Sequence, residues 1–155
     1  MKLTENFVKN ADAIIQAVRG WEFEARTGHA AHGSVFPFMS RFATCKLQGQ
    51  RAAPIIDLIF DGNGFDDDTK DFFSFIQIQR YMPGDFIVPH KDDYDITKLH
   101  LVTLTSSNVD GIMVQDGNDL VRVFDKAGQK VEFDYHAWHW VDPVQTERYS
   151  LVVGE

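Results

Sequence analysis

The sequence has few of the features that mark secreted, membrane or disulfide-stabilised proteins. It contains 155 residues and one cysteine, Cys45, so an intramolecular disulfide is excluded and a reducing compartment is favoured. The N-terminal segment lacks the apolar core of a signal peptide. No apolar run approaches the roughly 18 residues that a membrane-spanning helix needs. These absences predict a soluble, cytoplasmic protein that has no membrane partner.

Positive charge is scarce as well. The chain has 15 Lys and Arg residues against 23 Asp and Glu residues, which gives a formal net charge of −8. Proteins that bind phosphate backbones normally carry a basic face, so this balance argues against duplex nucleic acid as a partner. There is also no internal repeat, linker or low-complexity segment. We therefore expect one domain over residues 1–155, long enough to bury a core.

One amphipathic helix stands out near the N-terminus, over residues 4–19. Its apolar residues recur with helical spacing, and Gly20 follows where a helix commonly ends; they are Phe7, Ala11, Ile14, Ile15 and Val18. Residues 52–60 form an apolar element of ambiguous type. Residues 66–68 are three aspartates, which we interpret as a solvated turn because the alternating ligands of a calcium loop are missing.

From residue 72 onward the pattern is that of short β-strands. Alternating or short apolar runs, separated by turn residues such as Gly117-Asn118, predict about eight strands, over residues 72–81, 85–90, 99–105, 111–114, 120–124, 130–135, 138–141 and 149–153. A single helix followed by such a series predicts a mainly β fold of the jelly-roll type. One helix leaves much of the sheet exposed, and a second copy of the chain could cover it, so a homo-oligomer is one alternative.

His90 and Asp92 are the first candidates for a chemical site. Residues i and i+2 of a strand point to the same side, so this imidazole and carboxylate would project together. They would supply two ligands of a 2-His-1-carboxylate iron site. The third ligand should come from a later strand, where His136 and His139 both stand. His29 and His32 flank a small-residue loop that suits contact with substrate better than metal binding. The sequence does not decide whether residues 28–50 form a lid over the site.

The ordered set His90-x-Asp92, His139 and Arg148-x-Ser150 resembles the signature of the Fe(II)- and 2-oxoglutarate-dependent dioxygenases. The turn at residues 81–84, Tyr-Met-Pro-Gly, and the run at residues 139–144, His-Trp-Val-Asp-Pro-Val, are similar to the prolyl hydroxylase-like branch. The resemblance covers roughly residues 75–154. It selects His139 over His136 as the third ligand, because His139 begins the His-x-Val-x-Pro-Val run.

The resemblance implies a double-stranded β-helix of the cupin-like, jelly-roll class and an enzyme that hydroxylates a C–H bond. Its cofactors would be Fe(II), 2-oxoglutarate as cosubstrate, and dioxygen. Fe(II) would be held by His90, Asp92 and His139. The residues implied for the cosubstrate pocket are Arg148, Ser150, Tyr81, and Thr103 or Thr105.

The substrate implied by the resemblance is a prolyl residue in a peptide, a free amino acid or another small molecule. One departure concerns residues 110–113, where Asp-Gly-Ile-Met replaces the Gly-Gly-x-Leu of the family. The alternative function is a non-catalytic, cupin-like module that binds a metal or another ligand. Arg148 and Ser150 argue against that alternative, because a simple metal binder does not need residues that bind a cosubstrate carboxylate.

Overall fold

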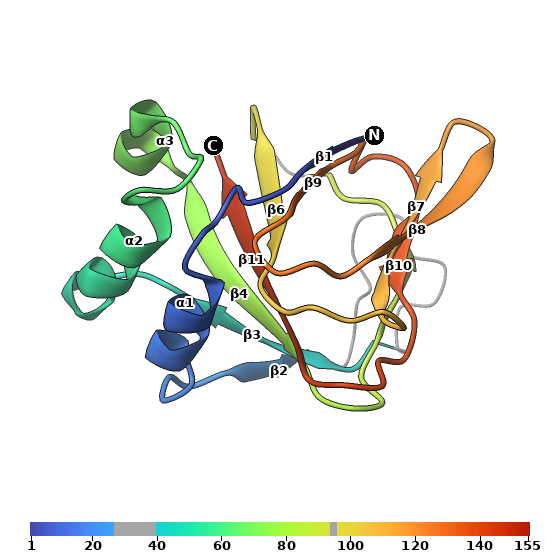
Figure 1. Cartoon of the computed structure of the whole chain (residues 1–155), viewed down its shortest axis with the longest axis horizontal. Helices are drawn as coiled ribbons and strands as arrows, with labels where there is room; N and C mark the ends of the chain where they lie inside the picture. Colours follow the sequence, from blue (N-terminus) through green and yellow to red (C-terminus); the bar gives the residue numbers. More distant parts are fainter. Residues whose placement is uncertain (27–39, 94–95) are drawn as a thin grey trace.

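Two antiparallel sheets face each other in the computed structural model, which describes residues 1–26, 40–93 and 96–155 (Figure 1). The larger sheet has seven strands in the order β1-β9-β6-β11-β4-β3-β2. These strands are β1 (Lys2–Thr4), β2 (Glu24–Arg26), β3 (Phe42–Lys46), β4 (Phe75–Tyr81), β6 (Leu99–Thr103), β9 (Lys130–Glu132) and β11 (Arg148–Gly154). The smaller sheet has four strands in the order β5-β10-β7-β8. They are β5 (Ile87–His90), β7 (Gly111–Asp116), β8 (Asp119–Phe124) and β10 (His139–Val141).

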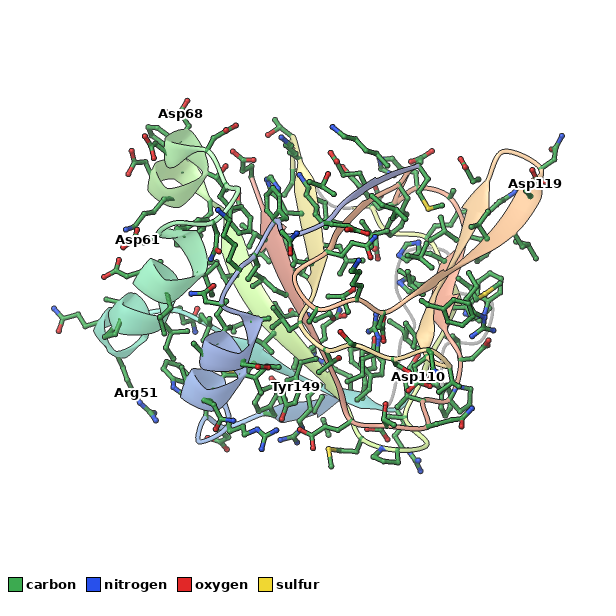
Figure 2. The ribbon with its side chains drawn as sticks, viewed as in Figure 1. Arg51, Asp61, Asp68, Asp110, Asp119 and Tyr149 are labelled. Carbon is green, nitrogen blue, oxygen red and sulfur yellow. The ribbon has the colours of Figure 1, made fainter. Side chains whose placement is uncertain are left out.

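From β4 onward the chain alternates between the sheets, except at the hairpin of β7 and β8. Strands β4, β6, β9 and β11 belong to the larger sheet, whereas β5, β7, β8 and β10 belong to the smaller one. This winding is the jelly-roll or double-stranded β-helix arrangement, so the predicted fold class is confirmed. Figure 2 shows Asp119 at the tip of the β7–β8 hairpin, which projects from one side of the molecule.

Three short α-helices lie on the outer face of the larger sheet (Figure 1). They are α1 (Ala11–Val18), α2 (Ala53–Phe60), which follows the 3-10 turn η1 (Gln50–Ala52), and α3 (Asp67–Phe72). Apolar residues of α1 and α2 pack with Ile76 and Ile78 of β4 and with Leu151 and Val153 of β11 in one buried cluster. Because neighbours along a strand face opposite ways, the residues between these four face the smaller sheet. The period-2 pattern of β4 and β11 therefore gives one apolar face to the helices and leaves the other for a cavity.

Several predicted boundaries were wrong. The helix expected over residues 4–19 begins only at Ala11, because residues 2–4 form β1 and pair with β9. The ambiguous segment 52–60 is helical. Asp67 and Asp68 lie in the first turn of α3, where their negative charges interact favourably with the helix dipole. The chain therefore has more helix than the one element predicted.

All eight predicted strands are present with shifted ends, and β1, β2 and β3 were not foreseen. The pair His29 and His32, and most of the suggested lid, lie outside the described residues. None of the helices within the described ranges is both long and apolar enough to span a membrane.

Candidate metal centre

The side chains of His90, Asp92 and His139 meet in the space between the two sheets. His90 ends β5 and pairs in register with His139, which begins β10, so their ring centroids are 4.2 Å apart. Asp92 follows β5 by two residues, and its backbone N–H donates to the Tyr135 carbonyl oxygen at 2.8 Å. All three residues are buried, and one ligand atom from each lies within 4.8 Å of the others. The strand pairing thus brings together residues that are 47 positions apart in the chain.

The hydrogen bonds of the two histidines prepare them as metal ligands. Nδ1 of His90 lies 2.7 Å from the Val88 carbonyl oxygen, and Nδ1 of His139 lies 2.9 Å from the Ala137 carbonyl oxygen. A carbonyl oxygen can only accept, so each Nδ1 must carry the proton. In a neutral imidazole the other nitrogen, Nε2, is then a lone-pair donor to metals.

Both Nε2 atoms lie near the Asp92 carboxylate. The distance is 3.6 Å from His90 to Oδ1 and 2.9 Å from His139 to Oδ2. Where lone pairs converge in this way, a proton or a metal ion between them removes their repulsion, and the 2.9 Å contact has the geometry of a hydrogen bond. Two imidazole nitrogens and one carboxylate oxygen are the donor set that non-haem iron takes, so the residues fit Fe(II).

His136 has a different role from His139. Its Nδ1 donates to the backbone carbonyl oxygen of Asp92 at 2.9 Å, and the residue is exposed. It is outside the cluster and instead fixes the segment that carries Asp92. The structure therefore brings His139, rather than His136, to the other two candidate ligands.

A turn connects β4 of the larger sheet to β5 of the smaller one. Gly84 adopts a φ of +91°, a left-handed conformation that favours glycine. Its N–H donates to the Val144 carbonyl oxygen at 2.8 Å, which ties this turn to the segment between β10 and β11. The Pro83-Gly84 pair thus positions Tyr81 at the end of one sheet and His90 on the other.

Arg148 begins β11 and lies opposite Tyr81 in the strand register. Its side chain is almost completely buried, and its Nε donates to Oδ2 of Asp125 at 2.8 Å. The guanidinium carbon lies 5.1 Å from the centre of the Tyr81 ring. Within the described residues, the terminal nitrogens of Arg148 have no hydrogen-bond partner, and neither does the Tyr81 hydroxyl.

These unpartnered donors belong to the wall of the same cavity as the three candidate ligands. Burial raises the pKa of Tyr81 well above its ordinary value, although Arg148 opposes the shift, so the hydroxyl keeps its proton at neutral pH. The cavity therefore presents a guanidinium and a phenol that can donate together to a carboxylate.

The other two expected cosubstrate residues lie behind the cavity wall. Ser150 is fully buried, and its hydroxyl donates to Oε1 of Gln79 at 3.0 Å. Thr103 is buried beside Ser150 in the register of β6 and β11. Among the described residues that line the cavity, Gln79 is present but Ser150 and Thr103 are not. The Thr105 hydroxyl accepts a hydrogen bond from the Tyr149 N–H at 3.2 Å.

Asp125 is a site residue that the sequence did not reveal. Its side chain is 1% exposed, and its Oδ1 has no hydrogen-bond partner within the described residues. Burial raises the pKa of its carboxyl group, and the Arg148 charge opposes the shift. In the sequence Asp125 begins Asp-Lys-Ala-Gly, which reads as an ordinary hairpin turn. Only the strand pairing reveals its contact with an arginine 23 residues away.

The cavity has a volume of about 450 Å³, within the range of small-molecule sites. Its polar and charged lining residues are Arg26, Thr44, Lys46, Gln77, Gln79, Tyr81, His90, Asp92, His139 and Arg148. The apolar part of the lining includes Phe75, Leu99, Leu101 and Phe133. Arg26, Thr44 and Lys46 lie in a region, residues 21–50, for which the sequence pattern was weak.

Comparison with solved structures places this arrangement among known folds. No protein family matches the chain by sequence, and no curated protein does. A 2OG-Fe(II) oxygenase-family oxidoreductase from Burkholderia pseudomallei superimposes with a TM-score of 0.72 at 16% identity, over 98% of this chain and 83% of that one. The chain has the fold of the Fe(II)/2-oxoglutarate oxygenases.

Two prolyl hydroxylases have the same fold. A viral collagen prolyl hydroxylase from Paramecium bursaria Chlorella virus-1, solved as a complex with 2OG, gives a TM-score of 0.61 at 15% identity, over 99% of this chain and 93% of that one. A prolyl hydroxylase from Trichoplax adhaerens was solved in complex with a peptide fragment of the hypoxia inducible factor oxygen degradation domain. It gives a TM-score of 0.65 at 13% identity, over 99% of this chain and 81% of that one. These likenesses show that the chain shares its fold with both prolyl hydroxylases.

Proposed function

We propose that this protein is an Fe(II)- and 2-oxoglutarate-dependent dioxygenase that hydroxylates a C–H bond, with one catalytic domain over residues 1–155. The observation that carries this proposal is the content of one cavity. A buried His-Asp-His cluster shares it with a buried arginine whose terminal N–H groups have no acceptor among the described residues.

His90, Asp92 and His139 would hold Fe(II) from one side and leave the opposite positions to other ligands. When bound, Fe(II) and 2-oxoglutarate supply the oxidation: dioxygen converts the cosubstrate to succinate and carbon dioxide, and its second oxygen atom enters the substrate C–H bond. The chain itself orients the metal and excludes water. The carbonyl oxygens of Val88 and Ala137 keep each Nε2 turned toward the metal.

Arg148 and Tyr81 would bind the carboxylate of 2-oxoglutarate that is remote from the metal. Asp125 holds Arg148 through Nε, which leaves both terminal nitrogens for the ligand. A guanidinium presents two parallel N–H donors to a carboxylate, and the Tyr81 hydroxyl adds a third. Ser150 and Thr103 would support this wall from behind, through Gln79 and the strand pairing.

The presence of Arg148 and Tyr81 in the cavity favours an oxygenase over a cupin-like module without catalytic turnover. A site that only stores or binds a metal would not require the terminal N–H groups of Arg148 and the Tyr81 hydroxyl on the wall of the same cavity, because together these donors suit the carboxylate of a second ligand. The peptide bound by the Trichoplax adhaerens enzyme makes a peptide one candidate substrate class for this protein. A free amino acid or other small molecule is the second.

An anaerobic titration tests the proposal. The metal-free protein is titrated with Fe(II) and then with 2-oxoglutarate, and the visible charge-transfer band of an iron-chelated 2-oxo acid is followed. Asp92→Ala should abolish the band. Arg148→Ala should leave it but require roughly 10- to 150-fold more cosubstrate, the equivalent of about 1.5–3 kcal/mol for hydrogen bonds to a charged group.

Arg122→Ala is the matched control for Arg148, because Arg122 is a surface arginine paired with Asp142 and does not line the cavity. It should titrate like the wild type. A protein that binds Fe(II) without any band on addition of 2-oxoglutarate would point to the non-catalytic module. A protein that binds no Fe(II) would contradict both functions.

A further inference from the structure

The cavity carries two further cations, Arg26 and Lys46, on the side formed by β2 and β3, whereas Arg148 lies on β11. Arg26 ends β2 and Lys46 ends β3, the two strands at one edge of the larger sheet (Figure 1). Because β2 and β3 are antiparallel, the Arg26 backbone lies opposite Phe42, four residues before the exposed Lys46. The Arg26 side chain reaches back along β3 to Thr44, two residues from Lys46. Lys46 pairs with Gln77 of β4, whereas Arg148 pairs with Tyr81, four residues further along the same strand. Four residues of a strand span about 13 Å. The Arg26 backbone lies in a strand that is separated from β4 by β3, about 10 Å to the side.

Neither cation is neutralised by a strong partner. Nε of Arg26 donates to the Thr44 hydroxyl oxygen at 3.1 Å, which holds the side chain along β3. Its nearest carboxylate is that of Glu24, 3.9 Å from Nη2 and 77% exposed, so this pair is weak. Within the described residues, Lys46 makes no side-chain hydrogen bond or ion pair.

The charge of the cavity is opposite in sign to that of the whole protein. The described lining residues include three permanent cations, and Asp92, which belongs to the metal cluster, is their only carboxylate. Asp125 balances Arg148 from behind the wall. Residues 27–39, which follow Arg26 in the sequence, contain no acidic residue. In a chain with a net charge of −8, these two weakly paired cations along one side of the cavity favour the binding of an anion.

The remaining walls restrict what this anion can be attached to. Phe75, Leu99, Leu101 and Phe133 supply apolar surface, while Thr44 and Gln77 supply polar groups next to the cations. The total volume of about 450 Å³ must also hold the metal and the cosubstrate. A compact molecule with a hydrocarbon body and one carboxylate matches these walls.

We propose that the substrate is a small carboxylic acid whose carboxylate is bound by Arg26 and Lys46, which orients its hydrocarbon part toward His90, Asp92 and His139. This inference rests on the proposed oxygenase function. The planar guanidinium of Arg26, fixed by Thr44, provides the directional hydrogen bonds, and Lys46 provides a second charge. Arg26 and Lys46 are then substrate-binding residues, distinct from the residues proposed for 2-oxoglutarate.

The test uses matched probes that differ only in charge: the N-acetyl derivatives of L-proline, L-leucine and L-phenylalanine, and the corresponding amides. Each is titrated anaerobically into the protein loaded with Fe(II) and 2-oxoglutarate, with calorimetry and the charge-transfer band as readouts. We expect at least one acid to bind at least tenfold more tightly than its amide. Arg26→Gln and Lys46→Met should each remove that difference.

The same variants should change the affinity for 2-oxoglutarate by less than about twofold, and Lys126→Met, a surface lysine outside the cavity, should behave as the wild type. Equal binding of acids and amides, or no acid binding at millimolar concentration, would overturn the inference. So would a loss of 2-oxoglutarate affinity in Arg26→Gln and Lys46→Met, because it would assign both cations to the cosubstrate. Failure of the oxygenase function itself would be seen earlier, as the absence of the band before any probe is added.

Discussion

Replacing Asp125 by asparagine would leave the Arg148 guanidinium buried without its counter-charge. The two side chains are 1% and 3% exposed and are joined by a 2.8 Å hydrogen bond. Removing one partner of such a buried pair typically costs about 3–5 kcal/mol, because the remaining charge is left desolvated. We therefore expect the free energy of unfolding of Asp125→Asn to fall by about this amount.

For a chain of this length each kcal/mol shifts the melting temperature by about 2–4 °C, so the melting temperature should fall by about 6–20 °C. Urea unfolding of Asp125→Asn, Arg148→Met and the double variant forms the assay. The double variant leaves no unpaired charge, so it should be destabilised by much less than the sum of the two single variants. Additive effects would refute the claim that the two charges stabilise each other.

The pH dependence of Arg148→Met provides a second check on the same pair. Burial already raises the pKa of Asp125, and the opposing Arg148 charge is absent in this variant. A carboxyl group whose pKa is raised in the folded state gives stability that is present below its unfolded pKa, about 4, and that is lost as the pH rises through the folded value. Arg148→Met should therefore be closest to wild-type stability near pH 4 and furthest from it at neutral pH. A deficit independent of pH would contradict this.

Three further predictions concern other parts of the site and fold. His139→Ala should weaken Fe(II) binding, measured by calorimetry, by more than the roughly 10- to 100-fold typical of losing an outer partner. Gly111→Ala should lower the free energy of unfolding by about 1–3 kcal/mol, since its Cβ would clash with the backbone carbonyl oxygen of Val123 in β8. Gly20→Ala, whose Cβ would lie in open space, should leave the free energy of unfolding unchanged. Burial alone would raise the pKa of Asp110, but hydrogen bonds from residues 145–146 lower it. The stability that ionised Asp110 contributes should thus be present above about pH 4 and be lost as the pH falls through the pKa of the folded state. In urea titrations, the stability of Asp110→Asn should not show this loss at acid pH.

Local rules explain what could be predicted before the structure was known. Strand alternation follows from the period of two residues, which any sequence with a buried and an open face must show. That period placed His90 and Asp92 on one side, and the alternating run over residues 72–81 and the apolar run over residues 149–153 predicted the strands that the structure shows as β4 and β11. The resemblance in the same segments pointed to His139 over His136.

The errors arose where a long-range contact overrides a local preference. The helical stripe that begins at Phe7 suggested a longer helix, but residues 2–4 pair with β9, more than 120 positions away. The role of Ser150 is a different matter and stays a prediction: it has the expected spacing from Arg148, and its hydroxyl donates to Gln79, which lines the cavity. Spacing alone cannot distinguish a lining residue from one that supports the lining, because both face the same side of the strand.

By itself, then, the sequence determined the mainly β character of this protein and the residue types of a candidate iron site, because strand period and ligand spacing are local properties. Only the tertiary structure showed that His139 pairs in register with His90 and that Asp125 holds Arg148. It also decided that Arg26 and Lys46 line the same cavity. These relations depend on which strands pair, and in an antiparallel fold the burial of apolar faces across the whole chain sets that pairing.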